Sequence, residues 1–106
     1  MVDNSASTTN SSSNQYACEN TEDDIFLLSY QDLAKKYFSS SSERICYGTE
    51  YCGTGALYYW TRSPYSSYSN NAWYVSDDGY LYDDIVSGDF GVRPALCFDL
   101  SGVSSD

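Results

Sequence analysis

Histidine is absent from this chain of 106 residues, and basic residues are scarce. Because His is the commonest general base and the commonest metal ligand, its absence excludes Ser-His-Asp and Cys-His catalysis and the zinc sites that need His. Lys and Arg together number 5 against 15 Asp and Glu, which gives a formal charge of −10 and a sequence pI of about 4.1. Such a chain repels phosphate backbones and anionic lipid. We therefore expect no nucleic-acid partner and no enzymatic activity.

Long apolar runs are missing as well. No apolar stretch approaches the roughly 20 residues that a membrane-spanning helix requires. The N-terminal sequence MVDNSASTTNSSSNQY has neither the basic region nor the apolar stretch of a signal peptide. We therefore expect no membrane insertion in this segment. A chain of this length holds one modest core, so we also expect a single folded domain.

Four cysteines are present, but none forms a C-x-x-C pair that would indicate a zinc knuckle. Several cysteines in a short chain rich in Tyr and Ser are typical of secreted proteins. Disulfides are therefore compatible with the sequence, although their pairing cannot be deduced from it. For Cys46 and Cys52 a structural disulfide or a buried thiol is favoured over redox or nucleophilic chemistry, because no His can activate either thiol. The remaining two are Cys18 and Cys97.

The N-terminal segment contains almost no apolar side chain. Such a composition cannot offset the entropy cost of ordering the chain. We therefore expect residues 1–15 to form a flexible Ser/Thr/Asn-rich segment and residues 16–106 to form the folded domain. The apolar run at 25–28 then predicts a buried strand.

A short helix is predicted directly after that strand. Ser29 stands three residues before Asp32, which is the spacing of a capping box, and apolar residues follow at helical intervals. The helix is expected over residues 30–38, with Lys35 and Lys36 in its last turn. The serines of 39–42 predict a loop, and residues 43–47 predict a brief extended segment.

The second half of the chain predicts antiparallel strands. Residues 57–62 are rich in strand formers and end before Pro64, and residues 73–76 predict a second strand. Asp77-Asp78-Gly79 is a strong hairpin turn, for which residues 80–82 would be the returning strand. A closing strand is predicted from Ala95 onward, with Pro94 at its start. The sum is an α+β fold with one short helix and mainly antiparallel strands.

The stretch from Tyr65 to Asp89 has the composition of a binding surface. It is rich in Tyr, Ser, Asn, Asp and Gly, and it contains no Lys, Arg, Glu, Gln or Met. Tyr offers a large rigid contact area at low entropic cost, while Ser, Asn and Gly adapt their hydrogen bonds to a partner. The alternative explanation is a turn-rich antiparallel region without a binding role, which would also be rich in Ser, Asn, Asp and Gly. Such a region would not require the tyrosines of this stretch, which are Tyr65, Tyr68, Tyr74, Tyr80 and Tyr82.

Few residues offer metal-binding or catalytic chemistry. The neighbouring carboxylates Asp77/Asp78 and Asp83/Asp84 could bind calcium or act as an acid/base pair, but acidic residues beside Gly are more often turn formers. No twelve-residue calcium loop is present. We therefore expect no cofactor and no metal, with calcium as the option left open. Arg62 and Arg93 each stand near a proline, where an Arg commonly closes a buried hydrogen-bond network.

Sequence blocks spread along the chain resemble a family of bacterial domains of unknown function. In order they are Asp24-Ile25-Phe26-Leu27-Leu28-Ser29, Lys36-Tyr37-Phe38, Glu43-Arg44-Ile45, Trp60-Thr61-Arg62-Ser63-Pro64, Asn70-Asn71-Ala72, Asp78-Gly79 and Gly91-Val92-Arg93-Pro94-Ala95-Leu96. The resemblance runs from Asn20 to Leu100, and the blocks W-x-R-S-P and G-V-R-P-A-L are its most specific parts. The chain departs from the family at Tyr59 and Thr61, where Trp and Leu are usual.

The resemblance implies a C-type-lectin-like fold, which the family shares with relatives of the formylglycine-generating enzyme. Many members look like variable proteins of diversity-generating retroelements, in which a reverse transcriptase randomises adenines. Codons of the AAY type then yield Tyr, Ser, Asp and Gly, but never Lys, Glu, Gln, Met or Trp. Members usually carry a further block ahead of the Ile-Phe-Leu-Leu-Ser strand. The resemblance therefore implies either the C-terminal part of a longer protein or a version of the fold shortened at its N-terminus. Display on a cell surface or a phage is implied in the same way.

On this interpretation, exposed variable residues bind the ligand and a constant scaffold supports them. The scaffold residues are Trp60, Arg62, Pro64, Gly79, Gly91, Arg93 and Pro94. The ligand-binding residues, all expected to be exposed, are Tyr65, Ser66, Ser67, Tyr68, Ser76, Asp77, Tyr80, Tyr82, Asp83, Asp84, Ser87 and Asp89.

The function that we expect is recognition of a protein or glycan ligand, with no bond made or broken. Asp carboxylates around the tyrosines favour a basic or hydroxyl-rich ligand. One alternative is a structural module of a larger surface protein, in which residues 65–89 contact another domain of the same protein. A second alternative is an oxidase-like enzyme with copper held by a Cys pair, for which Cys46, Cys52 and Cys97 are the candidates.

Overall fold

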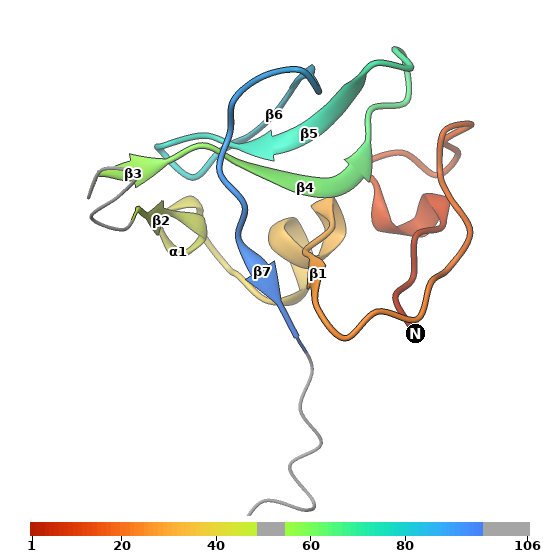
Figure 1. Cartoon of the computed structure of the whole chain (residues 1–106), viewed down its shortest axis with the longest axis horizontal. Coiled ribbons are helices and arrows are strands. Elements are labelled where there is room, and N and C mark those ends of the chain that lie inside the picture. The colour runs from red at the N-terminus through yellow and green to blue at the C-terminus, as the bar shows by residue number, and fades with distance from the viewer. Residues whose placement is uncertain (49–54, 97–106) are drawn as a thin grey trace, which may run out of the picture.

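The computed structural model, which describes residues 1–48 and 55–96, contains a three-stranded antiparallel sheet that we call the central sheet (Figure 1). Its strands lie in the order β4 (Tyr59–Pro64), β5 (Asn71–Val75) and β6 (Leu81–Ile85). Two smaller antiparallel pairs flank it: β1 (Phe26–Leu27) with β7 (Pro94–Ala95), and β2 (Cys46–Tyr47) with β3 (Ala56–Leu57). The predicted α+β class, with few helices and mainly antiparallel strands, is confirmed.

The β5–β6 hairpin closes at the Asp77-Asp78-Gly79 turn that the sequence predicted. The Gly79 amide donates to the Ser76 carbonyl at 2.9 Å, and the Ser76 amide donates to the Tyr80 carbonyl at 2.8 Å. Gly79 has φ +85°, a left-handed conformation that favours glycine. A Cβ atom on Gly79 would lie 1.8 Å from the Ser41 carbonyl oxygen, so the turn also packs closely against the next element.

The predicted helix after β1 is present and begins with a capping box. The Ser29 hydroxyl accepts the Asp32 amide at 3.1 Å, and the Asp32 carboxylate accepts the Ser29 amide at 3.0 Å. Helical winding covers residues 30–36, of which η2 (Asp32–Lys36) has the wider turns of a π-helix. Its Leu33 is fully buried against Tyr59 and Val75 of the sheet, and these three residues form the core cluster.

Two predictions for the following segment are wrong. Residues 41–44, expected to be loop and extended chain, form the short helix α1 (Ser41–Arg44), and the extended part is confined to β2. The Arg44 Nε donates to the Gly79 carbonyl at 2.7 Å, so contact with the hairpin turn holds this helix. The buried strand predicted earlier in the chain, at residues 25–28, is shorter than expected. Only Phe26 and Leu27 pair, and Ile25 is exposed.

The N-terminal segment differs from the flexible chain expected for residues 1–15. Val2 and Thr21 exchange backbone hydrogen bonds, and Ala6–Thr8 forms the 3-10 helix η1. Thr8, Thr9 and Asn14 are buried. The segment packs beside β4, where the Ser63 hydroxyl donates to the Thr8 carbonyl at 3.0 Å. Polar side chains that bond to backbone groups replace the apolar contacts that the composition lacks.

The chain returns to the sheet after β6. Gly91 forms a parallel bridge with Tyr59 of β4, and β7 then pairs with β1. The predicted closing strand is therefore present at Pro94–Ala95, but Leu96 is not part of it, and the expected continuation from residue 97 onward lies outside the described residues. Across residues 1–48 and 55–96, no helix has the length and apolar character needed to cross a membrane.

Candidate binding surface

Strand alternation separates the side chains of the central sheet into two faces. Tyr59, Val75 and Leu81 point to the inner face, where they meet Leu33. The outer face carries the side chains next to these in each strand, which are those of Trp60, Tyr74 and Tyr82. The register places Trp60 beside Tyr74 and Tyr74 beside Tyr82. A row of aromatic rings therefore crosses all three strands on the side opposite the core.

Two further aromatic residues complete this surface. Phe90, in the segment that follows β6, folds back so that its ring centroid lies 4.5 Å from that of Tyr74 and 4.6 Å from that of Trp60. Tyr58, just before β4, stacks on Tyr74 at 5.9 Å. Such separations are those of favourable aromatic pairs. We call this set the outer aromatic face; it consists of Tyr58, Trp60, Tyr74, Tyr82 and Phe90.

The outer aromatic face is covered at its centre and open at its rim. Trp60, Tyr74 and Phe90 are half-buried because they pack on one another. Tyr58 keeps 41% of its surface exposed and Tyr82 keeps 47%. Tyr80 extends the rim. It pairs with Ser76 at the end of the hairpin, lies on the same face as Tyr82 and is 54% exposed. The exposed rings lie on a rigid sheet, which suits them to contact a partner.

The electrostatic field at this face is negative. The pKa of Tyr74 lies above its ordinary value, chiefly because burial disfavours the phenolate and secondly because the Asp84 charge opposes it. Asp84 lies two residues after Tyr82 in β6, so its side chain points to the same face. No Lys or Arg occurs from residue 63 to residue 92. The face therefore combines electron-rich rings with unbalanced carboxylates.

Part of the predicted ligand-binding set gathers here. Side chains on the outer face of the β6 segment include three members of the set, namely Tyr80, just before the strand, and Tyr82 and Asp84 within it. Asp89 is exposed and directly precedes Phe90 in the chain. Asp77, in the hairpin turn, and Ser87, in the segment after β6, are exposed at either end. These positions surround the outer aromatic face.

Other members of the predicted set do not join it. Ser76 was expected to be exposed and is buried. It is held by the turn residues, because its backbone bonds to Gly79 and Tyr80 and its hydroxyl donates to the Asp77 carboxylate at 3.2 Å. Asp83 points to the inner face beside Trp73 and accepts a hydrogen bond from the Asn71 side chain at 3.0 Å. The carboxylate is therefore committed to a contact within the hairpin.

Tyr65 and Tyr68 belong to a different cluster. Their rings stack at 6.0 Å, and the Tyr65 ring lies 5.3 Å from that of Trp73, which is buried on the inner face against Tyr30. Tyr65 and Ser66 are half-buried, while Ser67 and Tyr68 are exposed. The stretch from 65 to 89 thus contributes to two separate surfaces rather than one.

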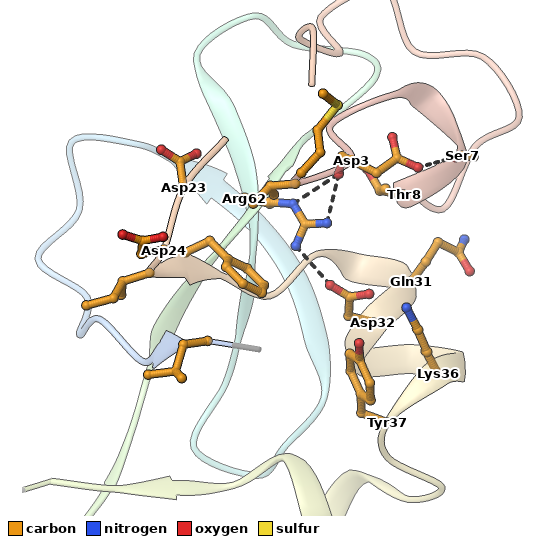
Figure 2. A pocket seen from close by; sticks show the side chains of 15 residues that line it. Asp3, Ser7, Thr8, Asp23, Asp24, Gln31, Asp32, Lys36, Tyr37 and Arg62 are labelled. Carbon is orange, nitrogen blue, oxygen red and sulfur yellow. Dashed lines mark hydrogen bonds and ion pairs between the residues drawn. The ribbon is translucent and has the colours of Figure 1, made fainter. Parts of the chain in front are cut away.

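Arg62, expected to be scaffold, joins three segments of the chain in a groove of about 670 Å³ (Figure 2). Its Nη1 donates to the Leu27 carbonyl at 2.9 Å and forms an ion pair with Asp32 at 2.8 Å. Its Nη2 donates to the Asp3 carbonyl at 2.8 Å. Figure 2 shows the guanidinium between Asp3 and Asp32, with Asp23 and Asp24 at the other side of the groove. Because the guanidinium is committed to these partners, the groove acts mainly as a junction between the N-terminal segment, β1 and η2.

Arg93 closes a second network, at the inner face. Its Nη1 donates to the Tyr59 hydroxyl at 3.0 Å and to the Arg44 carbonyl at 3.2 Å, and the Tyr59 hydroxyl in turn donates to that carbonyl. The guanidinium also lies 5.3 Å from the Phe38 ring centroid. Burial raises the pKa of Tyr59, while the hydrogen bond from Arg93 acts in the opposite direction.

The other predicted scaffold residues lie in varied settings. A Cβ on Gly91 would lie 3.2 Å from the Tyr58 carbonyl oxygen, where the chain crosses β4. The Pro64 carbonyl accepts the Asn14 side chain at 2.9 Å, and Pro94 is exposed at the start of β7. Trp60, also expected to be scaffold, lies instead within the outer aromatic face.

A second groove, of about 470 Å³, adjoins this face. Asp89 and Phe90 line it together with exposed apolar residues of the neighbouring segments, including Tyr47 and Val92. It continues the surface from the sheet toward β2 and β3.

The residues considered for metal or redox chemistry have local partners. The Asp78 carboxylate accepts the Tyr80 amide at 3.0 Å, which lowers its pKa and marks it as a turn former, and Asp84 accepts the Ile85 amide at 2.7 Å. In the described part of the chain, no three His, Cys, Asp or Glu residues gather as a metal site.

The cysteines considered for a disulfide or for redox chemistry are described in part. Cys18 is an exposed free thiol and Cys46 is a half-buried free thiol, while Cys52 and Cys97 lie outside the described residues.

Sequence reasoning missed three members of the outer aromatic face. Tyr58 and Phe90 were not singled out, and Tyr74 was noted for composition without a place in the site. Alternation of Tyr58 and Trp60 across the predicted strand could have placed both on one face. The return of Phe90 onto the sheet depends on the Gly91 bridge, which no local pattern predicts.

Comparison with protein families shows which family the chain belongs to. The model described as Domain of unknown function (DUF6273) matches residues 1–100, which includes the N-terminal segment. No curated protein and no solved structure matches the chain.

Proposed function

We propose that this chain, which belongs to the Domain of unknown function (DUF6273) family, is a ligand-binding domain that uses its outer aromatic face. The observation that carries the proposal is the continuous set of rings across β4, β5 and β6 whose rim residues Tyr58, Tyr80 and Tyr82 remain open to solvent. Aromatic residues on a rigid support are the side chains that contribute most to binding energy. The ligand classes that fit are a protein or a glycan.

The finer fold assignment, a C-type-lectin-like fold, is part of this proposal. The W-x-R-S-P and G-V-R-P-A-L blocks support it. The first block lies within β4, and the second contains both the Gly91 bridge to β4 and the strand β7. Display on a cell surface or phage would follow from the same family character. An experimental structure of the chain tests the fold directly.

Diversification by a retroelement would explain the residue types around the face. Tyr80, Tyr82 and Asp84, which lie at this face, are all residue types that a randomised AAY codon can encode. The test is codon-by-codon sequencing of this gene across isolates. Substitutions at adenines should accumulate at the rim while Arg62 and Gly79 stay constant. Even, low variation would contradict diversification and leave a binding surface with one constant ligand.

The binding proposal is tested by selection from a library of displayed random peptides and from a glycan array. Tyr82→Ser removes an exposed ring of the face at little cost to the fold, and Tyr37→Ser removes a ring of similar exposure, 51%, outside the face. We expect selected ligands to lose affinity for Tyr82→Ser by about tenfold or more and to keep it for Tyr37→Ser.

Two outcomes would contradict the proposal. Equal binding by both variants would place the ligand away from the outer aromatic face. Selective loss in Tyr37→Ser would move the site to the groove around Arg62, which Tyr37 also lines. The structural-module alternative predicts a third pattern, in which another domain of the full-length protein already covers Tyr58 and Tyr82 and no ligand is selected.

A further inference from the structure

The two edges of the central sheet differ. Along β4 (Tyr59–Pro64) the outward backbone groups are occupied: the Trp60 amide donates to the Gly91 carbonyl at 3.2 Å, and the Arg62 amide donates to the Leu28 carbonyl at 3.1 Å. At the other edge, no strand among residues 1–48 and 55–96 pairs with the outer side of β6 (Leu81–Ile85). The sheet is therefore closed on one side and open on the other.

The register identifies which groups of β6 are open. Hydrogen bonds join Ser76 to Tyr80 at one end of the hairpin and Asn70 to Val86 at the other. Because bonded and non-bonded pairs alternate in an antiparallel ladder, Tyr82 and Asp84 bond to β5, whereas Leu81, Asp83 and Ile85 direct their backbone groups outward.

The open edge is short and has a defined end. The Ile85 amide donates to the Asp84 carboxylate at 2.7 Å, and the Ile85 carbonyl accepts the Gly88 amide at 3.1 Å. Ile85 is thereby satisfied locally. Leu81 and Asp83 retain an outward amide and an outward carbonyl each, without a partner in the part of the chain that the structure describes. Exposed strand edges of this kind are templates for pairing with another chain.

Charge decides between the chains that could pair there. A second copy aligned on β6 would place Asp83 and Asp84 beside the same residues of its partner, and like charges in neighbouring strands are destabilising. The chain carries a formal charge of −10, and residues 63–92 contain no Lys or Arg. The occupant that the field favours is positively charged.

We propose that β6 receives an extended, basic segment of a partner protein, which adds as a fourth strand of the central sheet. This inference rests on the proposed function and names its ligand class. Every second side chain of the added strand would lie on the outer face beside Tyr80 and Tyr82. A Lys or Arg at those positions would meet electron-rich rings and the Asp84 carboxylate together. The backbone would bond to Leu81 and Asp83.

The experiment uses a synthetic peptide in which lysine and valine alternate, with the intact chain labelled with 15N and, on its tyrosine rings, with 13C. We expect saturable binding in which the amides of Leu81 and Asp83 shift and exchange more slowly with solvent, because they become hydrogen-bonded. A peptide in which glutamate replaces lysine should not bind. Methylation of the two peptide nitrogens that face β6 should weaken binding by about tenfold or more, because two hydrogen bonds are lost. Methylation of the alternate nitrogens, which face away, is the matched control and should leave affinity unchanged.

The outcomes separate this inference from the proposed function. If the lysine peptide shifts the rings of Tyr74 and Tyr82 but leaves the Leu81 and Asp83 amides unprotected, strand addition is wrong and the outer aromatic face remains the binding surface. Equal weakening by the two methylation patterns would also overturn strand addition. If the peptide does not bind at all, the basic-strand inference fails, and the library and array selection still decides the proposed function.

Discussion

Gly79 shows at the residue scale how a turn signal also positions a neighbouring element. Its left-handed φ of +85° closes the hairpin, and the absence of a side chain lets the Ser41 carbonyl approach. The Gly79 carbonyl then accepts the Arg44 side chain. One residue therefore holds both β6 and α1 in place.

Gly79→Ala should lower the free energy of unfolding by at least about 2 kcal/mol, because it combines an unfavourable φ with a backbone clash. Gly55→Ala is the matched control, since no atom of the described residues lies within 4 Å of a Cβ placed there. Its effect should stay within about 0.5 kcal/mol. Urea unfolding of both variants measures the difference. Equal stability of the two variants would contradict the described turn.

Tyr59 predicts how stability changes at high pH. Burial raises its pKa above the ordinary value of about 10, so the fold favours the neutral phenol. Its contribution is fully present below that ordinary pKa and is lost as the pH rises from there through the folded-state pKa. Tyr59→Phe should therefore reduce the fall in unfolding free energy above about pH 10.

The measurement is urea unfolding across the alkaline range, together with the ring-carbon NMR signal of Tyr59. Tyr37→Phe is the control, because Tyr37 is exposed. At neutral pH Tyr59→Phe should cost about 1 kcal/mol through the lost hydrogen bonds. An unchanged alkaline slope, or titration of Tyr59 at its ordinary pKa, would show that the hydroxyl is not buried as described.

At the element scale, local signals predicted the elements that form through local contacts. The capping box of Ser29 and Asp32 and the Asp-Asp-Gly turn are complete within a few residues, so sequence alone located the helix and the hairpin. Helix α1 could not be predicted from its serine-rich sequence, because its order depends on Gly79 and Arg44, far apart along the chain. The wide turns of η2 likewise have no local sequence signal that we can identify.

The N-terminal segment provides the element-scale test. The Asn14 side chain donates to the Pro64 carbonyl, so Asn14→Ala should lower the free energy of unfolding by about 1 kcal/mol. Asn10→Ala, at an exposed position in the same segment, should be neutral. The Val2 and Thr21 amides should also exchange slowly with solvent. If neither variant changes the free energy of unfolding and both amides exchange rapidly, the N-terminal segment is flexible, as its composition suggested, and the described packing is wrong.

At the scale of the whole molecule, charge and exposed aromatic area act together. The excess of carboxylates was readable from composition, and so was the abundance of tyrosine. Which tyrosines share a face was not, because Tyr58 and Phe90 reach the outer aromatic face only through the pairing of β4 with β5 and the bridge at Gly91. Tyr65 and Tyr68 join Trp73 instead for the same reason. Composition therefore indicated a surface, and topology decides its members.

The most direct measurement of the central claim is the position of a selected ligand, mapped on the ring signals of tyrosine labelled with 13C. We predict saturable shifts at Tyr58, Tyr74 and Tyr82, with Tyr37 and Tyr68 unchanged, because only the first three belong to the outer aromatic face. Shifts confined to Tyr37 or Tyr68, with Tyr58, Tyr74 and Tyr82 unaffected, would contradict the assignment of this face as the binding surface.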